Sequence, residues 1–235
     1  MYEYIAFPSH VIIIMVTMWL VDRMLIILDG KKSDINQRYY VVHALTNTLN
    51  MYLTYPDLIH CLLHPLNVVG FPHDTFPTAI CIALHLHHFV IGFNKMNLID
   101  CIHHLVSCFF VSIISTYYFT GPLVNYTIFF ICGLPGGIDY YLLTLKKYDI
   151  IDSMTEKYYN TILNMWIRLP GMLYTCFLAY INYILNIAPY HPFMIFLIII
   201  LNSSNAIFFA ERVVQNYGLW EYKTRIETKD MEDSE

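Results

Sequence analysis

Long apolar runs recur along this chain with short polar connections between them, and they limit the folds it can adopt more than any other feature. A helix needs about 20 mostly apolar residues to cross the hydrocarbon of a bilayer. The sequence therefore predicts an all-α integral membrane protein, a bundle or barrel of about seven transmembrane helices. The predicted spans are 5–28, 39–63, 77–94, 97–119, 122–145, 161–187 and 190–212.

The amino-acid composition agrees with a membrane environment. Hydrophobic residues make up 57% of the chain and charged residues 13%, whereas soluble domains are about 45–50% apolar and about 25% charged. Because the connections are short, we expect one multi-pass domain over 38–212, preceded by a first transmembrane helix and cytosolic loop at 1–37. The mixed charges of 213–235 predict a cytosolic tail that is frayed.

Lysine and arginine gather in every second connection. They flank the first, third and fifth connections and follow the last span, and the other three connections contain none. Cytosolic loops carry an excess of these residues, so we expect those connections and the C-terminus in the cytosol. Arg168 lies near the cytosolic end of the sixth predicted span, where its long side chain can snorkel. The remaining basic residues are Arg23, Lys31, Lys32, Arg38, Lys95, Lys146, Lys147, Lys157, Arg212, Lys223, Arg225 and Lys229.

Charge and cysteine content exclude two further classes. The basic residues are explained by membrane orientation and the formal net charge is -5, so nucleic-acid binding is not expected. The six cysteines have no paired spacing, which favours buried thiols over disulfides.

Histidines concentrate between 85 and 104, where the sequence reads HLHHFVIGFNKMNLIDCIHH. Ionisable side chains within a bilayer are costly and mark functional positions. If a helix begins near Asn97, the carboxylate of Asp100 reaches His103 or His104 along one helix face. A carboxylate that accepts a ring N–H raises the basicity of the other ring nitrogen. One of the two histidines is thereby suited to act as a general base or a nucleophile in the cytosolic half of the membrane.

The other histidines have alternative interpretations. A single histidine in a span is typically a hydrogen-bond partner between helices, and this is how we interpret His10, His43, His73 and His191. For His85, His87 and His88, a functional role and a role in helix packing are equally compatible with the sequence. His60 and His64 have a spacing that can form half of a metal site, but Pro65 ends that helix, so we expect no metal there.

The segment GLPGGIDY places Pro135, Gly136 and Gly137 inside the fifth predicted span. Proline breaks a transmembrane helix unless neighbours satisfy the freed backbone groups. Small residues also allow two helices to approach closely. We therefore expect either a break that shapes a cavity or a close helix contact at this point.

Several segments carry a family resemblance. They are RYYVVHAL at 38–45, the apolar span with polar positions at 83–88, DCIHHLVSCFF at 100–110, GLPGGIDYYLL at 133–143 and NMWIRLPGMLY at 164–174. In this order they resemble the TLC-domain family, which comprises ceramide synthases, translocation-chain-associating membrane proteins and lipid-homeostasis proteins. The resemblance covers roughly 38–212, and its most specific element is the pair His103 and His104 with Asp100 before it.

The resemblance implies a function in lipid metabolism at an endomembrane such as the endoplasmic reticulum. In ceramide synthases the histidine pair opens a longer motif with two aspartates and is implicated in moving an acyl group from acyl-coenzyme A to a sphingoid amine. By that resemblance His103 and His104 are the catalytic pair, and Asp139 is similar to the second aspartate. The segment 135–137 stands where the first aspartate is expected, so whether the chain is an enzyme stays open.

Acyl transfer requires a base or nucleophile, an oxyanion stabiliser and an apolar groove. His103 or His104 would supply the first, and Tyr140 or Arg168 the second. His85 and His88 would contact the substrate. Acyl-coenzyme A is then a cosubstrate, no cofactor is expected, and the partners are membrane lipids.

Two other functions remain open from the sequence. The same helical fold can bind, sense or move a lipid without catalysis. A membrane di-iron desaturase or hydroxylase is a third hypothesis, because an imidazole-rich site suits iron. The spacing of His85, His87 and His88 departs from the histidine boxes of those enzymes.

Overall fold

The computed structural model describes residues 2–29, 34–71, 73–92, 98–106, 121–187 and 190–232. Within them every regular element is a helix, which confirms the all-α prediction. The helices of the first half are α1 (Tyr2–Asp29), α2 (Ile35–Leu63), α3 (Phe76–Gly92) and α4 (Leu98–Leu105). Those of the second half are α6 (Pro122–Ile128), η4 (Phe129–Gly133), α7 (Leu134–Lys147), α8 (Ser153–Leu163), η5 (Asn164–Arg168), α9 (Leu169–Ile184) and α10 (Pro192–Glu232), where η denotes a π-helical segment.

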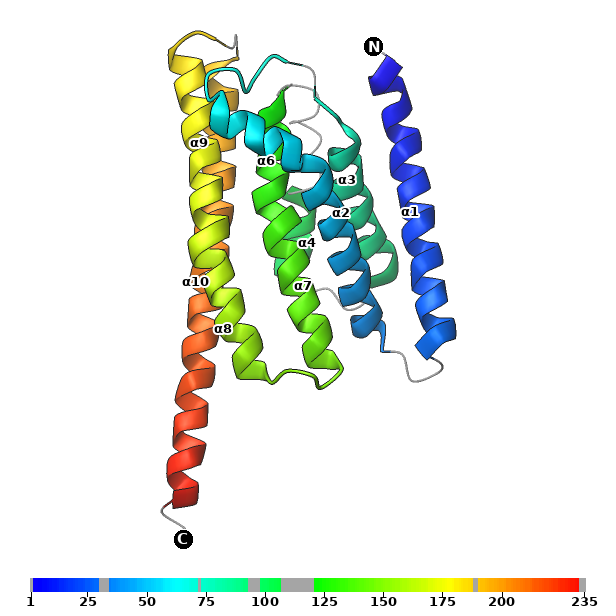
Figure 1. Ribbon diagram of the computed structural model, residues 1–235, viewed down its shortest axis with the longest axis vertical. Helices are drawn as coiled ribbons and strands as arrows, with labels where there is room; N and C mark the ends of the chain where they lie inside the picture. The colour runs from blue at the N-terminus through cyan, green and yellow to red at the C-terminus, as the bar shows by residue number, and fades with distance from the viewer. Residues whose placement is uncertain are drawn as a thin grey trace.

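The long helices run up and down beside one another, and α2 lies among its neighbours (Figure 1). The C-terminal end of α1, the start of α2 and the end of α7 lie at the same end of the bundle. There Lys147 Nζ lies 3.5 Å from a carboxylate oxygen of Asp34, and the Gln37 amide donates to the Lys147 carbonyl at 3.2 Å. Arg38 at the start of α2, and Lys146 and Lys147 at the end of α7, therefore lie toward this end of the bundle. Lys31, Lys32 and Lys95 lie outside the described residues.

Four helical stretches are long and apolar enough to cross a membrane: Phe7–Leu28, Pro122–Lys147, Ser153–Ile184 and Pro192–Ile226. The chain is thus suited to a membrane, although the count of seven spans is not confirmed. The helix α2 falls outside this set because polar side chains interrupt its apolar ones, and the apolar part of α3, Phe76–Val90, is shorter. Of the predicted span 97–119, only residues 98–106 are described.

Two predicted boundaries were wrong. The sixth span was expected to begin at 161, but α8 begins at Ser153, because the Asp152 carboxylate accepts the Thr155 N–H at 2.7 Å and caps the helix. The tail was expected to fray after 213, but α10 continues to Glu232. Within that extension the Arg225 guanidinium lies 2.6 Å from Glu221, a spacing of four residues that supports a helix.

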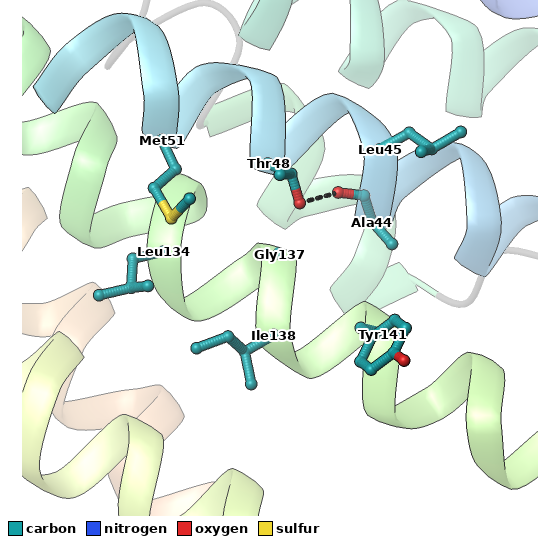
Figure 2. Close-up of a pocket in the computed structure, with 8 residues that line it drawn as sticks. All are labelled: Ala44, Leu45, Thr48, Met51, Leu134, Gly137, Ile138 and Tyr141. Carbon is teal, nitrogen blue, oxygen red and sulfur yellow. Dashed lines mark hydrogen bonds between the residues drawn. The ribbon is translucent and has the colours of Figure 1, made fainter. Parts of the chain in front are cut away.

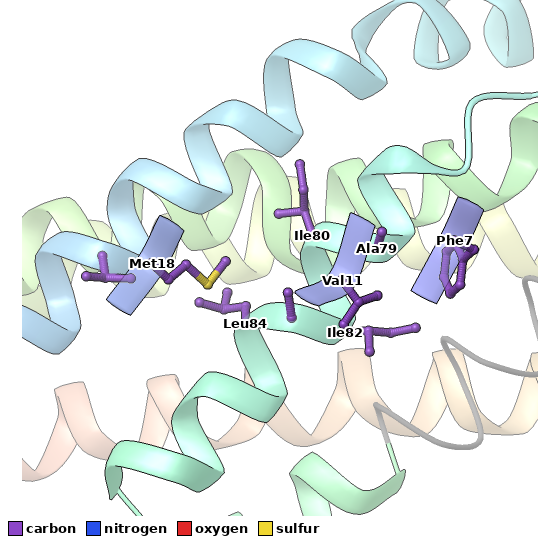
Figure 3. Close-up of a cluster of buried hydrophobic side chains, with 9 residues drawn as sticks. Phe7, Val11, Met18, Ala79, Ile80, Ile82 and Leu84 are labelled. Carbon is purple, nitrogen blue, oxygen red and sulfur yellow. The ribbon is translucent and has the colours of Figure 1, made fainter. Parts of the chain in front are cut away.

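The helix α1 packs on α3 through a cluster of buried apolar side chains (Figure 3). Ala79 and Ala83 of α3 are fully buried there, and their small side chains allow the two helices to approach closely. Phe7, Val11 and Met18 supply the α1 side of the contact.

The helix α2 packs against α7 on the small residues of GLPGG. A Cβ atom on Gly133 would lie 3.3 Å from the Met51 backbone, and one on Gly137 would lie 3.2 Å from the Thr48 hydroxyl oxygen. Gly133 and Gly137 are four residues apart, the spacing at which small residues let transmembrane helices meet. The close-contact prediction for this segment is therefore confirmed.

Two long helical stretches of the second half, Pro122–Lys147 and Ser153–Ile184, each contain a π-helical segment directly before the tripeptide Leu-Pro-Gly. We call these stretches the two rods and their π-helical segments the breaks. The segment η4 precedes Pro135, and η5 precedes Pro170. The breaks pack on one another, because a Cβ on Gly171 would clash with the ring of Phe130. Such π segments occur frequently at functional sites. Here the contact between Phe130 of η4 and Gly171 of α9 holds the two rods against each other.

Candidate functional site

Four ring side chains meet where α2, α3 and α7 come together, and we call them the ring cluster: Tyr39, His43, His88 and Tyr140. The Tyr39 hydroxyl oxygen lies 3.3 Å from His88 Nδ1 and 3.2 Å from the Tyr140 hydroxyl oxygen. Tyr39 thus connects α3 to α7. The two contacts are satisfied if Tyr140 donates to Tyr39 and Tyr39, which accepts that hydrogen, donates its own to His88 Nδ1.

The ring of His43 is held in one tautomer. His43 Nδ1 lies 2.9 Å from the Tyr39 carbonyl oxygen, which can only accept, so Nδ1 carries the hydrogen. Nε2 of the neutral ring then carries the lone pair that a general base needs. The ring contacts Tyr39 and Tyr140 in tilted arrangements, at centroid distances of 3.8 Å and 4.5 Å. The arrangement can accept and pass protons.

Ion pairs hold the helices beside the ring cluster. Arg38 Nε lies 2.8 Å from Asp22, which joins the start of α2 to α1 next to Tyr39. Lys146 Nζ lies 3.3 Å from Glu156, which joins the end of α7 to α8. Both carboxylates are almost fully buried. Breaking such buried pairs is strongly destabilising, so these contacts hold the positions of the rings.

The predicted catalytic residues Asp100, His103 and His104 lie on α4. The helical backbone supports the expected spacing, and their side chains lie outside the described part. Five residues separate Gly92 of α3 from Leu98 of α4, so the two Cα atoms are at most ~20 Å apart. The helix α4 therefore begins near the end of α3 that carries His88.

Arg168 forms a hydrogen bond between two helical stretches that the sequence did not predict. Its Nη2 donates to the Ile131 carbonyl of η4, and its Nη1 donates to Asn164 Oδ1 at 3.2 Å. In an α-helix that carbonyl would accept the N–H of residue 135, which is proline and has none. Arg168 thus supplies a donor to this carbonyl from the neighbouring helical stretch, with its guanidinium carbon 4.5 Å from the centroid of the Phe209 ring.

Asp139 lies beside Tyr140 on α7. Its Oδ1 is buried and has no hydrogen-bond partner among the described residues. It forms no ion pair within 4 Å of Arg168, although the two charges interact electrostatically. A buried carboxylate oxygen without a partner is costly in a membrane interior. Asp139 is therefore suited to bind water or a polar substrate group.

An open groove of about 300 Å³ runs between α2 and α7 (Figure 2). The Thr48 hydroxyl, its main polar group besides that of Tyr141, donates to the Ala44 carbonyl at 2.7 Å. The groove is otherwise apolar and fits a hydrocarbon chain. It lies beside the ring cluster, because Ala44 follows His43 and Tyr141 follows Tyr140. Its lining is Ala44, Leu45, Thr48, Met51, Leu134, Gly137, Ile138 and Tyr141.

Two histidines that we expected between helices cap helix starts instead. The His73 Nδ1 atom accepts the Gly121 N–H at 3.0 Å, directly before α6. The His191 Nδ1 atom accepts the Phe193 N–H at 3.2 Å in the first turn of α10. His60 Nε2 lies 2.9 Å from the Asn67 carbonyl, beside the ring of His64. Among the described residues no three His, Cys, Asp or Glu side chains are grouped as metal ligands.

Of the predicted site residues, the structure brings His88 and Tyr140 together through Tyr39. His85 is half-buried three residues before His88 on α3. The sequence did not point to Tyr39, and His43 was interpreted as a hydrogen-bond partner between helices. The sequence did contain an indication: Tyr39 and His43 are four residues apart, and other polar residues of the same span lie on the same helix face.

Comparisons with models of known families, with curated proteins and with solved structures found no match.

Proposed function

We propose that this chain is a multi-pass membrane protein of lipid metabolism that transfers an acyl group from acyl-coenzyme A to an amine or hydroxyl of a lipid. The ring cluster is the observation that carries the proposal. It places two imidazoles and two phenols within hydrogen-bond or ring-contact distance inside a membrane-suited bundle. Groups that hold and pass protons are what acyl transfer requires.

The reaction follows from these groups and from the α4 pair. His103 or His104 removes the proton from the lipid amine or hydroxyl, which attacks the thioester carbonyl. A new C–N or C–O bond forms, the C–S bond breaks, and the thiolate takes the proton from the imidazolium. A phenol such as Tyr140 donates a hydrogen bond to the oxyanion that develops on the carbonyl oxygen.

The proposed location agrees with a water-soluble cosubstrate. The ring cluster lies near the end of the bundle that carries Arg38, Lys146 and Lys147, and we propose that this end and the C-terminus face the cytosol. An endomembrane such as the endoplasmic reticulum is then the site of action. Acyl-coenzyme A reaches the rings from the cytosol, and the acceptor lipid reaches them from the bilayer.

A second function is favoured by the groove between α2 and α7. Its apolar lining and its volume of about 300 Å³ suit a lipid chain whether or not chemistry follows. A protein that only binds or senses lipids would use the groove and leave the histidines without a reaction.

The experiment that tests the proposal uses labelled acyl-coenzyme A and a panel of amine and hydroxyl lipids with the purified protein. We expect an acylated lipid, and we expect His103→Ala or His104→Ala to lower its rate by about 10² to 10⁴. His64→Ala, at an exposed histidine on the opposite end of α2, is the matched control and keeps the activity. Failure to form product or an acyl-protein adduct, with lipid bound equally by all variants, would leave only the binding function.

A further inference from the structure

Two cysteines that are 51 residues apart in the chain meet inside the bundle. Cys81 lies on α3, and Cys132 lies in η4, the break of the rod Pro122–Lys147. Their Sγ atoms are 3.4 Å apart, and both side chains are thiols. Because a disulfide bond is ~2.0 Å long, the two sulfurs need to approach by ~1.4 Å to form one.

The two sulfurs have different hydrogen-bond partners. The Asn50 amide nitrogen of α2 donates to Cys81 Sγ at 3.3 Å. Such a donor stabilises the negative charge that develops on the Cys81 sulfur when its proton leaves. Cys132 Sγ donates to the Ile128 carbonyl at 3.5 Å, so its hydrogen is directed toward its own rod. Cys81 is therefore the thiol whose environment favours a nucleophilic sulfur.

The two thiols also differ in exposure. Cys81 is 6% exposed, whereas Cys132 is half-buried. Their surroundings are apolar, with Val124, Ile128 and Ile195 in the same buried cluster. Access controls which cysteines are oxidised. An oxidant that dissolves in hydrocarbon therefore reaches Cys132 first, and Cys81 is in position to react with the product.

The thiol pair lies on the same two elements as part of the ring cluster. His88 follows Cys81 by seven residues on α3, and Tyr140 follows Cys132 by eight residues on the rod. Seven residues are about two helical turns, so Cys81 and His88 share one face of α3, ~10 Å apart along its axis. A bond between Cys81 and Cys132 would therefore hold α3 against the rod beside the ring cluster.

We propose that Cys81 and Cys132 form a reversible disulfide that locks α3 to η4, with a lipid hydroperoxide as the oxidant. Cys132 Sγ attacks the terminal peroxide oxygen: an S–O bond forms, the O–O bond breaks, and the alkoxide leaves with the thiol proton as an alcohol. Cys81 Sγ then attacks the Cys132 sulfur. The S–S bond forms, the S–O bond breaks, and the hydroxyl leaves with the Cys81 proton as water.

The electrons balance, because the two thiols together give two electrons to the peroxide. A dithiol reductant reverses the step by exchange with the disulfide and is itself oxidised. The modification does not depend on acyl transfer.

The test treats the reduced full chain in phospholipid liposomes with cumene hydroperoxide, an apolar hydroperoxide. Remaining thiols are alkylated, the protein is digested, and linked peptides are identified by mass spectrometry. We expect a linked peptide that joins Cys81 to Cys132 and that dithiothreitol separates. Cumyl alcohol, the same molecule without the peroxide bond, should leave the pair unlinked.

Cys132→Ser removes one of the two sulfurs, and we expect the link to be lost. Cys176→Ser is the matched control and should keep the link: Cys176 is similarly buried, at 8%, but donates to a backbone carbonyl, that of Ile199, at 3.6 Å. If Cys132→Ser does not fold, Cys132→Ala takes its place.

Thermal unfolding followed by circular dichroism measures the lock itself. A link between residues 51 apart constrains the unfolded chain, so oxidation should raise the unfolding midpoint of wild type and of Cys176→Ser by ~5–15 °C and leave that of Cys132→Ser unchanged. Wild type that stays unlinked in cumene hydroperoxide overturns the proposal, as does an equal yield of linked peptide in cumyl alcohol. A link that leaves the midpoint unchanged overturns the lock.

Discussion

The contact between Arg168 and the Ile131 carbonyl predicts a specific energetic coupling. Arg168→Met removes this charged donor from a carbonyl of η4. A hydrogen bond from a charged donor is worth about 1.5–3 kcal/mol. We therefore expect the variant to lower the free energy of unfolding by about 2 kcal/mol, since its side chain still fills the space beside Phe209.

Pro135 lacks the N–H that would bond to this carbonyl in an α-helix. Pro135→Ala restores a backbone N–H that can bond to the Ile131 carbonyl. In that background we expect Arg168→Met to cost about 1 kcal/mol or less. The double-mutant cycle should then give a coupling energy of about 1 kcal/mol between two residues on different rods.

The assay is reversible unfolding of the purified protein in mixed detergent micelles, followed by circular dichroism. Arg225→Met is the control, because Arg225 forms an exposed pair with Glu221 on α10, and such pairs are worth about 0.3–0.5 kcal/mol. Equal destabilisation by Arg168→Met in both backgrounds would refute the donor-replacement argument. So would an effect no larger than that of the control.

Three further predictions concern the ring cluster, the groove and a helix cap. Tyr39→Phe keeps the ring but removes the hydroxyl between His88 and Tyr140, so the rate of acyl transfer should fall by about 10² with lipid binding unchanged. An unchanged rate would contradict a role of the Tyr39 hydroxyl in passing protons. Ala44→Phe fills the groove and should abolish copurification of lipid detected by mass spectrometry, whereas Leu62→Phe at an exposed position of the same helix should not. The Thr155 backbone N–H lowers the pKa of Asp152, so the capping interaction is present above the unfolded pKa of about 3.9 and is lost as pH falls through the lower folded value. Protection of the amides in the first turn of α8, relative to their intrinsic exchange rates at each pH, should fall only in strong acid, and protection that does not change with pH would contradict this.

Much of the fold follows from the sequence because apolar length is a strong signal. The length of the apolar runs located α1, the rod from α6 to α7 and the beginning of α10. It failed at Ser153, since the first turns of α8 are polar and only the cap at Asp152 indicates a helix there. It failed beyond 213 for a similar reason, because a charged helix held by pairs such as Glu221 with Arg225 has the composition of a disordered tail.

The candidate site was predictable in part. His88 and Tyr140 were identified from their chemistry, whereas Tyr39 required knowledge of which face of α2 turns inward. The task of Arg168 could not be read from the sequence, because it depends on two helix breaks meeting in space. The contact of Gly171 with Phe130 sets that meeting, and the two residues are far apart along the chain.

Because α10 is long, a small tilt of the helix displaces its C-terminal end. Its 41 residues extend ~60 Å at ~1.5 Å per residue, about twice the ~30 Å of hydrocarbon that any helix has to cross. Figure 1 shows its C-terminal end reaching past the other helices. Because the helix is continuous, a tilt of ~10° at the bilayer displaces a tip ~30 Å away by ~5 Å. Repacking inside the bundle is thereby converted into displacement in the aqueous phase, where a soluble molecule can respond to it.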